Sequence, residues 1–233
     1  YSPRQFEILN TVRYLRALDM PLPQIADFLK NRDIDVIEDK LLNQKQQVIQ
    51  KKKELEIIER KIDNRLHQIR DARDSELNVI KVFTAPPCRL IRINDSLRLK
   101  NQTDIEKTVS KLSANEDEPM VFLGKVGVGI SEENLCAQRY EKYDYAFLAL
   151  DEEDKYSAEV EYMTETLCVS IRFCGVHSDA PFYYRRLADY IKNNGLRISG
   201  FSREITMIDY GITSDTEKFV TEINIPVIKK ENF

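Results

Sequence analysis

The chain has 233 residues, 42% of them hydrophobic, and a formal net charge of −4. This length allows one large domain or two small ones, and this composition argues against both a disordered and a membrane protein. Because no apolar run approaches the length of a membrane span and no signal-peptide pattern is present, we expect a cytoplasmic protein without membrane contacts.

Two short helices are predicted at the beginning of the sequence. Ser2 followed by Pro3 is typical of an N-cap with proline in the first helical position. Apolar residues at helical spacing then predict a helix over 3–18, and a second helix is predicted over 23–30. A pair of helices this short cannot bury a core by itself, so we expect it to pack against residues outside the given sequence or against another domain.

A seven-residue apolar repeat begins at Ile34, in a stretch that contains no glycine or proline up to residue 85. The repeat positions, which we call the seam, are Ile34, Leu41, Val48, Leu55, Ile62 and Ile69. Six positions in register predict a coiled coil, whereas a long helix lying on a globular core needs a wider apolar stripe. A seam this narrow needs a partner helix, so we expect a homodimer.

Pro86 and Pro87 break the helical pattern and open a β-rich region. The strands that we predict there are 88–94, 120–130, 144–150, 157–162, 166–174, 197–209 and 218–228, and the helices are 103–114 and 180–193. The series reads as two copies of a strand–helix–strand–strand unit that form one antiparallel sheet. The expected fold class is therefore α+β, with a groove between the duplicated halves, where ligands commonly bind.

Three stretches resemble, in order, the modules of one protein family. "YSPRQFEILNTVRYLRALDMPLPQIADFL" is similar to the second half of a MerR-family DNA-binding domain, and the heptad helix resembles the antiparallel coiled coil by which that family dimerises. "IRFCGVHSDAPFYYRRLADYIKNNGLRISGFSREITMIDYG" and "FVTEINIPV" resemble the GyrI-like effector-binding domain of multidrug-sensing MerR regulators. The resemblance implies part of a winged-helix DNA-binding domain in residues 1–32, a dimerisation helix in 33–77 and an effector-binding domain in 78–233.

The resemblance implies a dimeric, ligand-responsive transcription regulator without enzymatic activity. Its partners are promoter DNA, a small aromatic or cationic effector and, indirectly, RNA polymerase. In the family's mechanism the dimer sits on an overlong promoter spacer, and ligand binding leads to bending and untwisting of the DNA. The family's helix-turn-helix would precede Tyr1, so no residue is assigned a base contact. Arg4 and Arg13 are candidates for phosphate contacts, with simple surface charge as the alternative.

One carboxylate, Glu204, lies within the apolar strand pattern "SGFSREITMIDYG" of the predicted effector domain. Aromatic faces attract flat or cationic ligands, and a buried carboxylate supplies the complementary charge. We therefore predict Glu204 as the ligand counter-charge, with an ion pair to Arg92 or Arg172 as the structural alternative. The aromatic candidates for ligand contact are Tyr145, Phe147, Tyr162, Phe173, Tyr183, Tyr184, Phe201 and Tyr210.

Strand alternation gives the side chain of Glu204 a direction. If Ile205 faces the covering helices, Glu204 faces the other side of the sheet, where an open groove would lie. Glu222 is the competing carboxylate for the ligand, and Glu159 and Glu161 are weaker candidates.

Two other functions are open. Some stand-alone GyrI-like domains are hydrolases for electrophilic small molecules that use a pocket glutamate as base, but the sequence shows no Ser–His–Asp arrangement. Its two histidines are His67, on the predicted coiled coil, and His177, in a predicted loop. A dimeric scaffold without a ligand would leave the groove unexplained. Cys174 and His177 form a C-x-x-H pair without a second ligand pair, so we predict no metal site. We also predict no cofactor and no catalytic residue.

Overall fold

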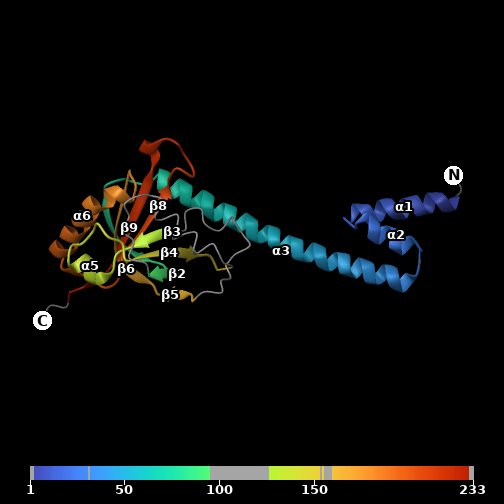
Figure 1. Cartoon of the computed structure of the whole chain (residues 1–233), viewed down its shortest axis with the longest axis horizontal. Coiled ribbons are helices and arrows are strands. Elements are labelled where there is room, and N and C mark those ends of the chain that lie inside the picture. Colours follow the sequence, from blue (N-terminus) through green and yellow to red (C-terminus); the bar gives the residue numbers. More distant parts are fainter. Residues whose placement is uncertain (1–2, 31, 95–125, 153, 155–158, 231–233) are drawn as a thin grey trace. The chain divides into compact units, whose positions relative to one another are not determined.

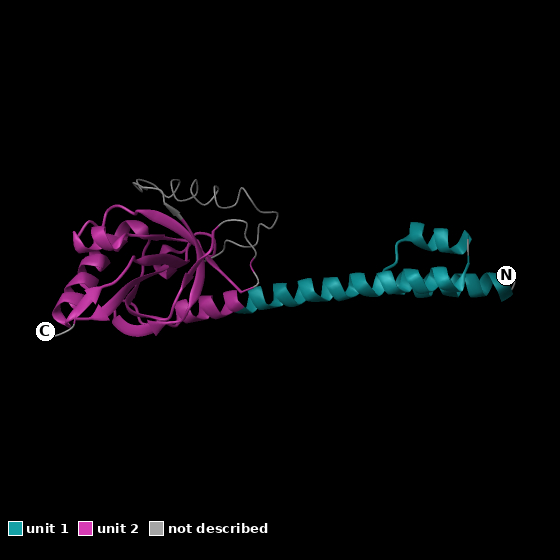
Figure 2. Cartoon of the chain, turned by 90° about the horizontal axis from the view of Figure 1, so that it is seen from below, with its two compact units in different colours: residues 1–63 teal, residues 64–233 magenta. Residues whose placement is uncertain are grey.

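The computed structural model of the chain describes residues 3–30, 32–94, 126–152, 154 and 159–230 (Figure 1). The chain divides into two compact units, Tyr1–Asp63 and Asn64–Phe233 (Figure 2). The boundary falls inside one continuous helix, α3 (Ile34–Arg73). Within the described ranges, no helix combines the length and the apolar character needed to cross a membrane.

The first unit has a small helical core. Helices α1 (Pro3–Ala17) and α2 (Leu22–Lys30) confirm the two predicted helices to within one residue. Ile37 and Leu41, near the beginning of α3, pack against the apolar cluster between these helices. The buried side chains of this cluster are Leu15, Met20, Ile25 and Phe28. Helix α3 therefore adds apolar side chains to the core of the helix pair, which the sequence reasoning did not expect of it.

Helix α3 carries the predicted seam and ends at Arg73, four residues before the predicted boundary. The seam side chains of Val48, Leu55 and Ile62 are exposed, as is Ile34, whereas Leu41 contacts the α1–α2 cluster. Leu55 retains 64% of its accessible surface. An exposed apolar row of this kind suits contact with a second helix, and dimerisation stays a prediction.

The second unit is α+β, with a curled antiparallel sheet (Figure 2). Its strands are β1 (Ile80–Ala85), β2 (Cys88–Asn94), β3 (Val126–Gly129), β4 (Tyr145–Leu150), β5 (Glu161–Met163), β6 (Thr166–Phe173), β7 (Leu196–Ile198), β8 (Arg203–Ile208) and β9 (Val220–Lys229). The order across the sheet is β1-β6-β9-β8-β3-β4-β2-β5, and β7 pairs with β9 beside this path. Helices α5 (Glu132–Cys136) and α6 (Ala180–Asn193) lie on one face of the sheet (Figure 1).

Most predicted elements of this unit are confirmed within the described residues. The predicted helix over 180–193 is α6, and the predicted strand over 88–94 is β2. The prediction missed β1 and α5 and placed β5 too early in the chain. The predicted helix over 103–114, together with residues 120–125 and 157–158, lies outside the described residues, so the duplication stays a prediction.

The single strand predicted over 197–209 is wrong, because the chain forms two strands there. Strand β7 pairs with Val227–Lys229 of β9, whereas β8 pairs with Val220–Asn224. Pro226 lies between the two pairings and has no amide hydrogen to offer. Ser202, in the connection between β7 and β8, instead donates its backbone N–H to the carbonyl of Ile130 at 2.9 Å. The break turns β8 towards β3.

Two glycines of β3 give room to aromatic rings of β4. Gly127 is opposed to Phe147, and Gly129 is opposed to Tyr145. A Cβ atom on Gly129 would lie 2.2 Å from the ring of Tyr145 and 2.4 Å from the carbonyl oxygen of Ser202. Only glycine therefore lets these rings lie across β3 towards β8.

Arg172 on β6 ties the last turns of α3 to the sheet. Its guanidinium donates to the carboxylates of Asp71 on α3 and Glu222 on β9, at 2.6 Å in each case. The hydrogen bond from Arg172 is the main reason why the pKa of Asp71 lies below its ordinary value. One side chain thus joins the helix to two strands.

Replacing Arg172 with methionine should lower the free energy of unfolding of the second unit by about 2 kcal/mol, because two carboxylates lose their shared guanidinium. Urea unfolding followed by tyrosine circular dichroism measures this change. The control is Arg73→Met, whose guanidinium pairs with Asp74 on the exposed surface and should matter little. Equal losses in the two variants would contradict a specific role for Arg172.

Candidate functional site

Glu204 lies on β8, and none of its side chain is exposed. Its neighbours across the sheet are Val128 on β3 and Ile223 on β9, and both belong to the apolar core that α6 covers. Directly opposed residues of antiparallel strands point to the same face, so Glu204 faces α6. The expectation that Glu204 faces the open side was wrong, because Ile205, opposed to the charged Glu222, is the residue that points there.

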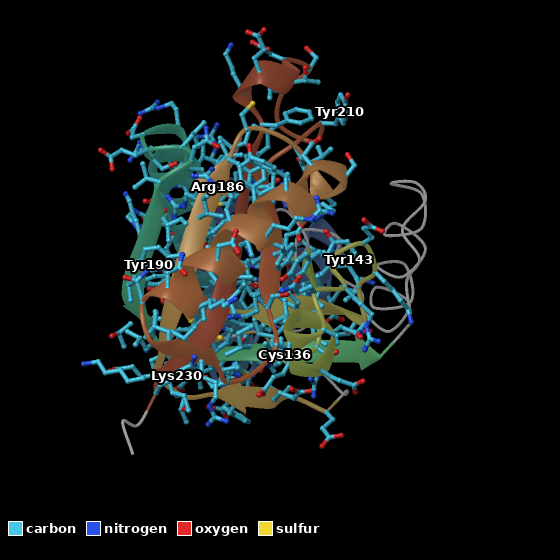
Figure 3. All side chains as sticks on the ribbon, turned by 90° about the vertical axis from the view of Figure 1, so that its left-hand side faces the viewer. Cys136, Tyr143, Arg186, Tyr190, Tyr210 and Lys230 are labelled. Carbon is cyan, nitrogen blue, oxygen red and sulfur yellow. The ribbon has the colours of Figure 1, made fainter. Side chains whose placement is uncertain are left out.

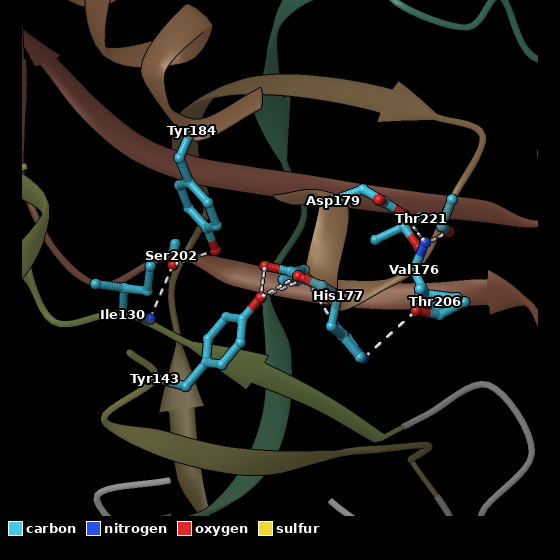
Figure 4. Close-up of polar contacts among 11 residues, drawn as sticks. Ile130, Tyr143, Val176, His177, Asp179, Tyr184, Ser202, Thr206 and Thr221 are labelled. Atoms are coloured by element: carbon cyan, nitrogen blue, oxygen red, sulfur yellow. Dashed lines mark hydrogen bonds and ion pairs between the residues drawn. The ribbon is translucent and has the colours of Figure 1, made fainter. Parts of the chain in front are cut away.

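Two side chains from separate segments meet the carboxylate (Figure 4). The hydroxyl of Tyr143, in the segment before β4, lies 2.8 Å from both carboxylate oxygens and donates to them. Nδ1 of His177 lies 2.5 Å from Oε1 of Glu204. His177 opens the short helix η2 (His177–Asp179), directly before α6. Three segments far apart in the sequence therefore converge on one buried carboxylate.

The structural alternative for Glu204, an ion pair with Arg92 or Arg172, is not formed. Arg92 pairs with Glu161 at 2.8 Å, and Arg172 pairs with Glu222 and with α3. These side chains lie on the face of the sheet opposite α6. Cross-strand pairing puts them on the same face as Ile205 rather than on the face of Glu204. Strand alternation thus separates the arginines from the carboxylate.

Burial keeps the phenols beside Glu204 protonated. The pKa of Tyr143 is raised well above its ordinary value, first by burial and then by the negative charge of Glu204. The same two causes raise the pKa of Tyr184, whose hydroxyl lies 2.9 Å from Oγ of Ser202. Both phenols therefore remain neutral and can serve as hydrogen-bond donors across the physiological pH range.

His177 lies on the solvent side of the cluster. Its side chain is 18% exposed, whereas the carboxylate that it contacts is fully enclosed. The imidazole meets the ring of Tyr143 edge-on, with 6.0 Å between the centroids. Asp179 accepts a hydrogen bond from the backbone N–H of Val176 at 3.0 Å and so closes the turn that presents the imidazole. The imidazole is thus held as a cover over Glu204.

Three of the predicted aromatic residues share the α6 face with Glu204. Tyr184, on α6, lies close enough to Glu204 for the carboxylate charge to raise the pKa of its phenol. Phe173 and Tyr183 stack on each other, with ring centroids 3.9 Å apart, and belong to the same apolar core or its border. The structure therefore brings Tyr184 to the carboxylate and uses the other two for packing.

Three further predicted aromatics lie on the opposite face, which the register of β3 and β4 assigns to Tyr145 and Phe147. Tyr145 meets Phe201 edge-on at 4.9 Å. The guanidinium of Arg92 lies 5.2 Å from the ring centroid of Tyr145 and 5.0 Å from that of Phe201. These rings hold a cation of the chain itself.

The remaining predicted residues lie at the periphery of their units. Tyr162 is 75% exposed on the edge strand β5, and Tyr210 follows the end of β8 and contacts Phe219. Figure 3 shows Tyr210 well away from Tyr143. Arg4 and Arg13 are exposed on α1, and phosphate contact by them stays a prediction.

His177 and Tyr143 are the site residues that the sequence reasoning missed. His177 was placed in a loop, although it precedes the beginning of α6 by three residues and a helix start fixes the position of such a residue. Tyr143 precedes β4 by two residues and was one aromatic among many. Because a buried Glu204 needs hydrogen-bond donors, a search for such donors could have identified His177 and Tyr143.

Within the described residues, no group of three or more histidine, cysteine, aspartate or glutamate side chains is arranged to hold a metal ion. The C-x-x-H pair has separate contacts. The thiol of Cys174 lies 3.3 Å from the carbonyl oxygen of Glu217, while His177 faces Glu204.

No protein-family model matches the chain, and no curated protein is similar to it in sequence. A solved structure described as an EcmrR–DNA complex in EcmrR-RPo is similar, at 17% identity and a TM-score of 0.49, over 98% of this chain and 85% of that one. The EcmrR C-terminal domain is similar at 16% identity and a TM-score of 0.47, over 65% and 98%. A hydrolase from Listeria innocua follows at 12% identity and a TM-score of 0.43, over 66% and 94%. Likenesses this distant do not assign a function.

Replacing Tyr143 with phenylalanine should lower the free energy of unfolding by about 1–3 kcal/mol, because the buried Glu204 loses a donor. Urea unfolding measures the loss.

The matched control is Tyr140→Phe. The hydroxyl of Tyr140 is buried without a hydrogen-bond partner among the described residues, so its removal should be neutral or stabilising. A Tyr143→Phe protein as stable as the wild type would show that Glu204 does not depend on the phenol.

Proposed function

We propose that the chain acts as a dimeric, ligand-responsive transcription regulator of the MerR type, and that its second unit senses a small aromatic or cationic molecule. The observation that carries the proposal is the buried carboxylate of Glu204, which a phenol and an imidazole hold in place of an arginine or lysine. An arginine would neutralise the carboxylate permanently. The imidazole is a weaker and replaceable partner, which leaves the negative charge available to a cationic ligand.

The position of Glu204 in the sheet supports a ligand site. We propose that the sheet consists of two related halves, one with β6, β8 and β9 and the other with β2, β3 and β4. Inside the edge strands β1 and β5, the order towards the junction is then first, third and second strand of each half, as in β6-β9-β8 and β2-β4-β3. Glu204 pairs with Val128 where the two proposed halves of the sheet adjoin, and on the α6 face of that junction we propose the ligand site.

A path from the site to the long helix supports regulation. Glu204 is followed by Ile205, which is opposed to Glu222 on β9, and Glu222 shares Arg172 with Asp71 of α3. A ligand that shifts β8 would therefore act on the end of a helix that continues into the first unit. For this to regulate, the ligand must bind the activating state more tightly than the resting state.

The proposed partners follow from the module order. A second copy would cover the seam of α3, and promoter DNA would contact the first unit, with Arg4 and Arg13 as phosphate contacts. RNA polymerase would respond to the changed DNA geometry. The proposed location is the cytoplasm.

A hydrolase for electrophilic small molecules is the second candidate, and the contact between His177 and Glu204 favours it, because a carboxylate beside an imidazole suits acid–base catalysis. The two functions differ in outcome. Steady release of acid from an activated ester, abolished by Glu204→Gln, would support the hydrolase, whereas binding without turnover would support the regulator.

Replacing Glu204 with glutamine should weaken the binding of tetraphenylphosphonium by about 1–3 kcal/mol, or about 5- to 150-fold, because the counter-charge is removed. Calorimetry measures the affinity. Tetraphenylborate, an anion of the same shape, should not lose affinity in the variant.

The matched control is Glu161→Gln, which removes a carboxylate from the opposite face beside Arg92. Its affinity for tetraphenylphosphonium should equal that of the wild type. An unchanged affinity in Glu204→Gln, or a larger loss of affinity in Glu161→Gln, would contradict the assignment of the site to Glu204.

Introducing glutamate at Val48 and Leu55 should convert the dimer into monomers, because charges at seam positions are buried without partners on association. Sedimentation velocity at micromolar concentration measures the change. The control carries glutamate at Gln46 and Lys53, which have the same seven-residue spacing two positions off the seam, and should remain dimeric. A seam variant that sediments as a dimer would place the interface elsewhere.

A further inference from the structure

The imidazole of His177 occupies the place beside Glu204 that a cationic group would take. Its Nδ1 lies 2.5 Å from Oε1 of Glu204, and the imidazole is partly exposed to solvent while the carboxylate is not. Tyr143 holds the carboxylate from another direction, through a hydroxyl that lies 2.8 Å from both oxygens (Figure 4). A ligand that approaches Glu204 from solvent therefore meets the imidazole first.

A chain of hydroxyl groups fixes the hydrogen on the other nitrogen of His177. The hydroxyl of Thr221 donates to the carbonyl oxygen of Gly175 at 2.7 Å. A hydroxyl has a single hydrogen, so the 3.1 Å contact between Thr206 and Thr221 uses the hydrogen of Thr206. The 3.4 Å contact between Thr206 and Nε2 of His177 then uses the hydrogen of the imidazole. This direction of donation puts a hydrogen on Nε2.

The contact between Nδ1 and Glu204 then requires a further proton. A neutral imidazole with its hydrogen on Nε2 has a lone pair on Nδ1, and an ionised carboxylate also has lone pairs alone. Two lone pairs 2.5 Å apart repel each other, so a proton lies between the two atoms, whichever of them it belongs to. Together, His177 and Glu204 are electrically neutral and share one proton.

The other titratable groups that face the pair keep their protonation when a ligand binds. Burial and the charge of Glu204 raise the pKa of Tyr143, in the segment before β4, and of Tyr184, on α6, so both remain neutral. Asp179, at the end of η2, is engaged with its own turn. Apart from Glu204 itself, the side chains of β8 and β9 that contact His177 or continue its hydrogen-bond chain are Thr206 and Thr221, which do not titrate in this range. Among the described residues, the shared proton is the one that a ligand can release.

We infer that His177 is a built-in counter-ion that a cationic ligand displaces, and that the displacement releases the shared proton. This inference rests on the proposed function, since it names the entry step and the ligand charge for the same site. The bound cation takes the negative charge of Glu204, the imidazole moves to solvent as a neutral group, and the proton passes to water. Charge is balanced, because one positive charge enters the site and one leaves it.

The inference also defines the ligand class. A neutral aromatic molecule that bound beside Glu204 would not compensate the carboxylate, so His177 and its proton would stay in place. An aromatic cation without a titratable proton replaces the imidazole and makes every released proton attributable to the protein. Because one proton is released, binding of such a cation strengthens with rising pH wherever displaced His177 is neutral.

Calorimetric titration with tetraphenylphosphonium at pH 8, in phosphate and in Tris, counts the protons, because the two buffers take up protons with different heats. We expect the wild type to release about one proton per bound cation. In His177→Gln, glutamine keeps an N–H donor for Glu204 without a titratable proton, and the release should fall close to zero. The control His67→Gln changes the other histidine, on α3, and should release as much as the wild type.

The outcomes separate this inference from the proposed function. Binding of tetraphenylphosphonium without proton release, or with equal release in wild type and His177→Gln, would overturn the displacement of His177 and leave the ligand site standing. Absence of tetraphenylphosphonium binding in the wild type would overturn the cationic-ligand site itself.

Discussion

A carboxylate enclosed in an apolar core is the constraint on which the second unit depends. Removing Glu204 from water is costly unless donors replace the lost hydration, and the cost grows if the group stays ionised. Tyr143 and His177 supply these donors from two segments that meet only in the folded chain. The segment before β4, the start of α6 and the strand β8 are therefore held together by one side chain, and a change at Glu204 reaches all three.

The two faces of the sheet differ in the partners of their charged side chains. On the face opposite α6, Arg92 and Arg172 pair with Glu161 and Glu222, and aromatic rings surround the guanidinium of Arg92. Each of these two arginines has a carboxylate partner. On the α6 face, the carboxylate has an imidazole and phenols, whose contacts are neutral overall. A ligand can exchange with the second kind of partner more readily than with the first, and for this reason we propose the ligand site on the covered face.

Much of the fold followed from patterns in the sequence. The seven-residue repeat from Ile34 predicted α3, and apolar alternation with the Pro–Pro break predicted most strands. The break between β7 and β8 was not predictable, because it depends on the pairing of β9 around Pro226, a contact between segments far apart in the chain. The face of Glu204 was missed for a related reason. Alternation relates Glu204 to Ile205, but only the cross-strand register with Val128 and Ile223 says which of them faces the helix. Tyr143 comes from the segment before β4 and His177 from the short helix η2, and the sequence offers no periodic signal for either.

The most direct test of the account is a crystal structure of the chain with tetraphenylphosphonium bound. The account predicts the phosphonium beside the carboxylate of Glu204, with the imidazole of His177 turned away from it and the phenol of Tyr143 still bonded. A complex in which His177 still covers Glu204, with the cation against Tyr145 and Phe201 on the opposite face, would contradict it.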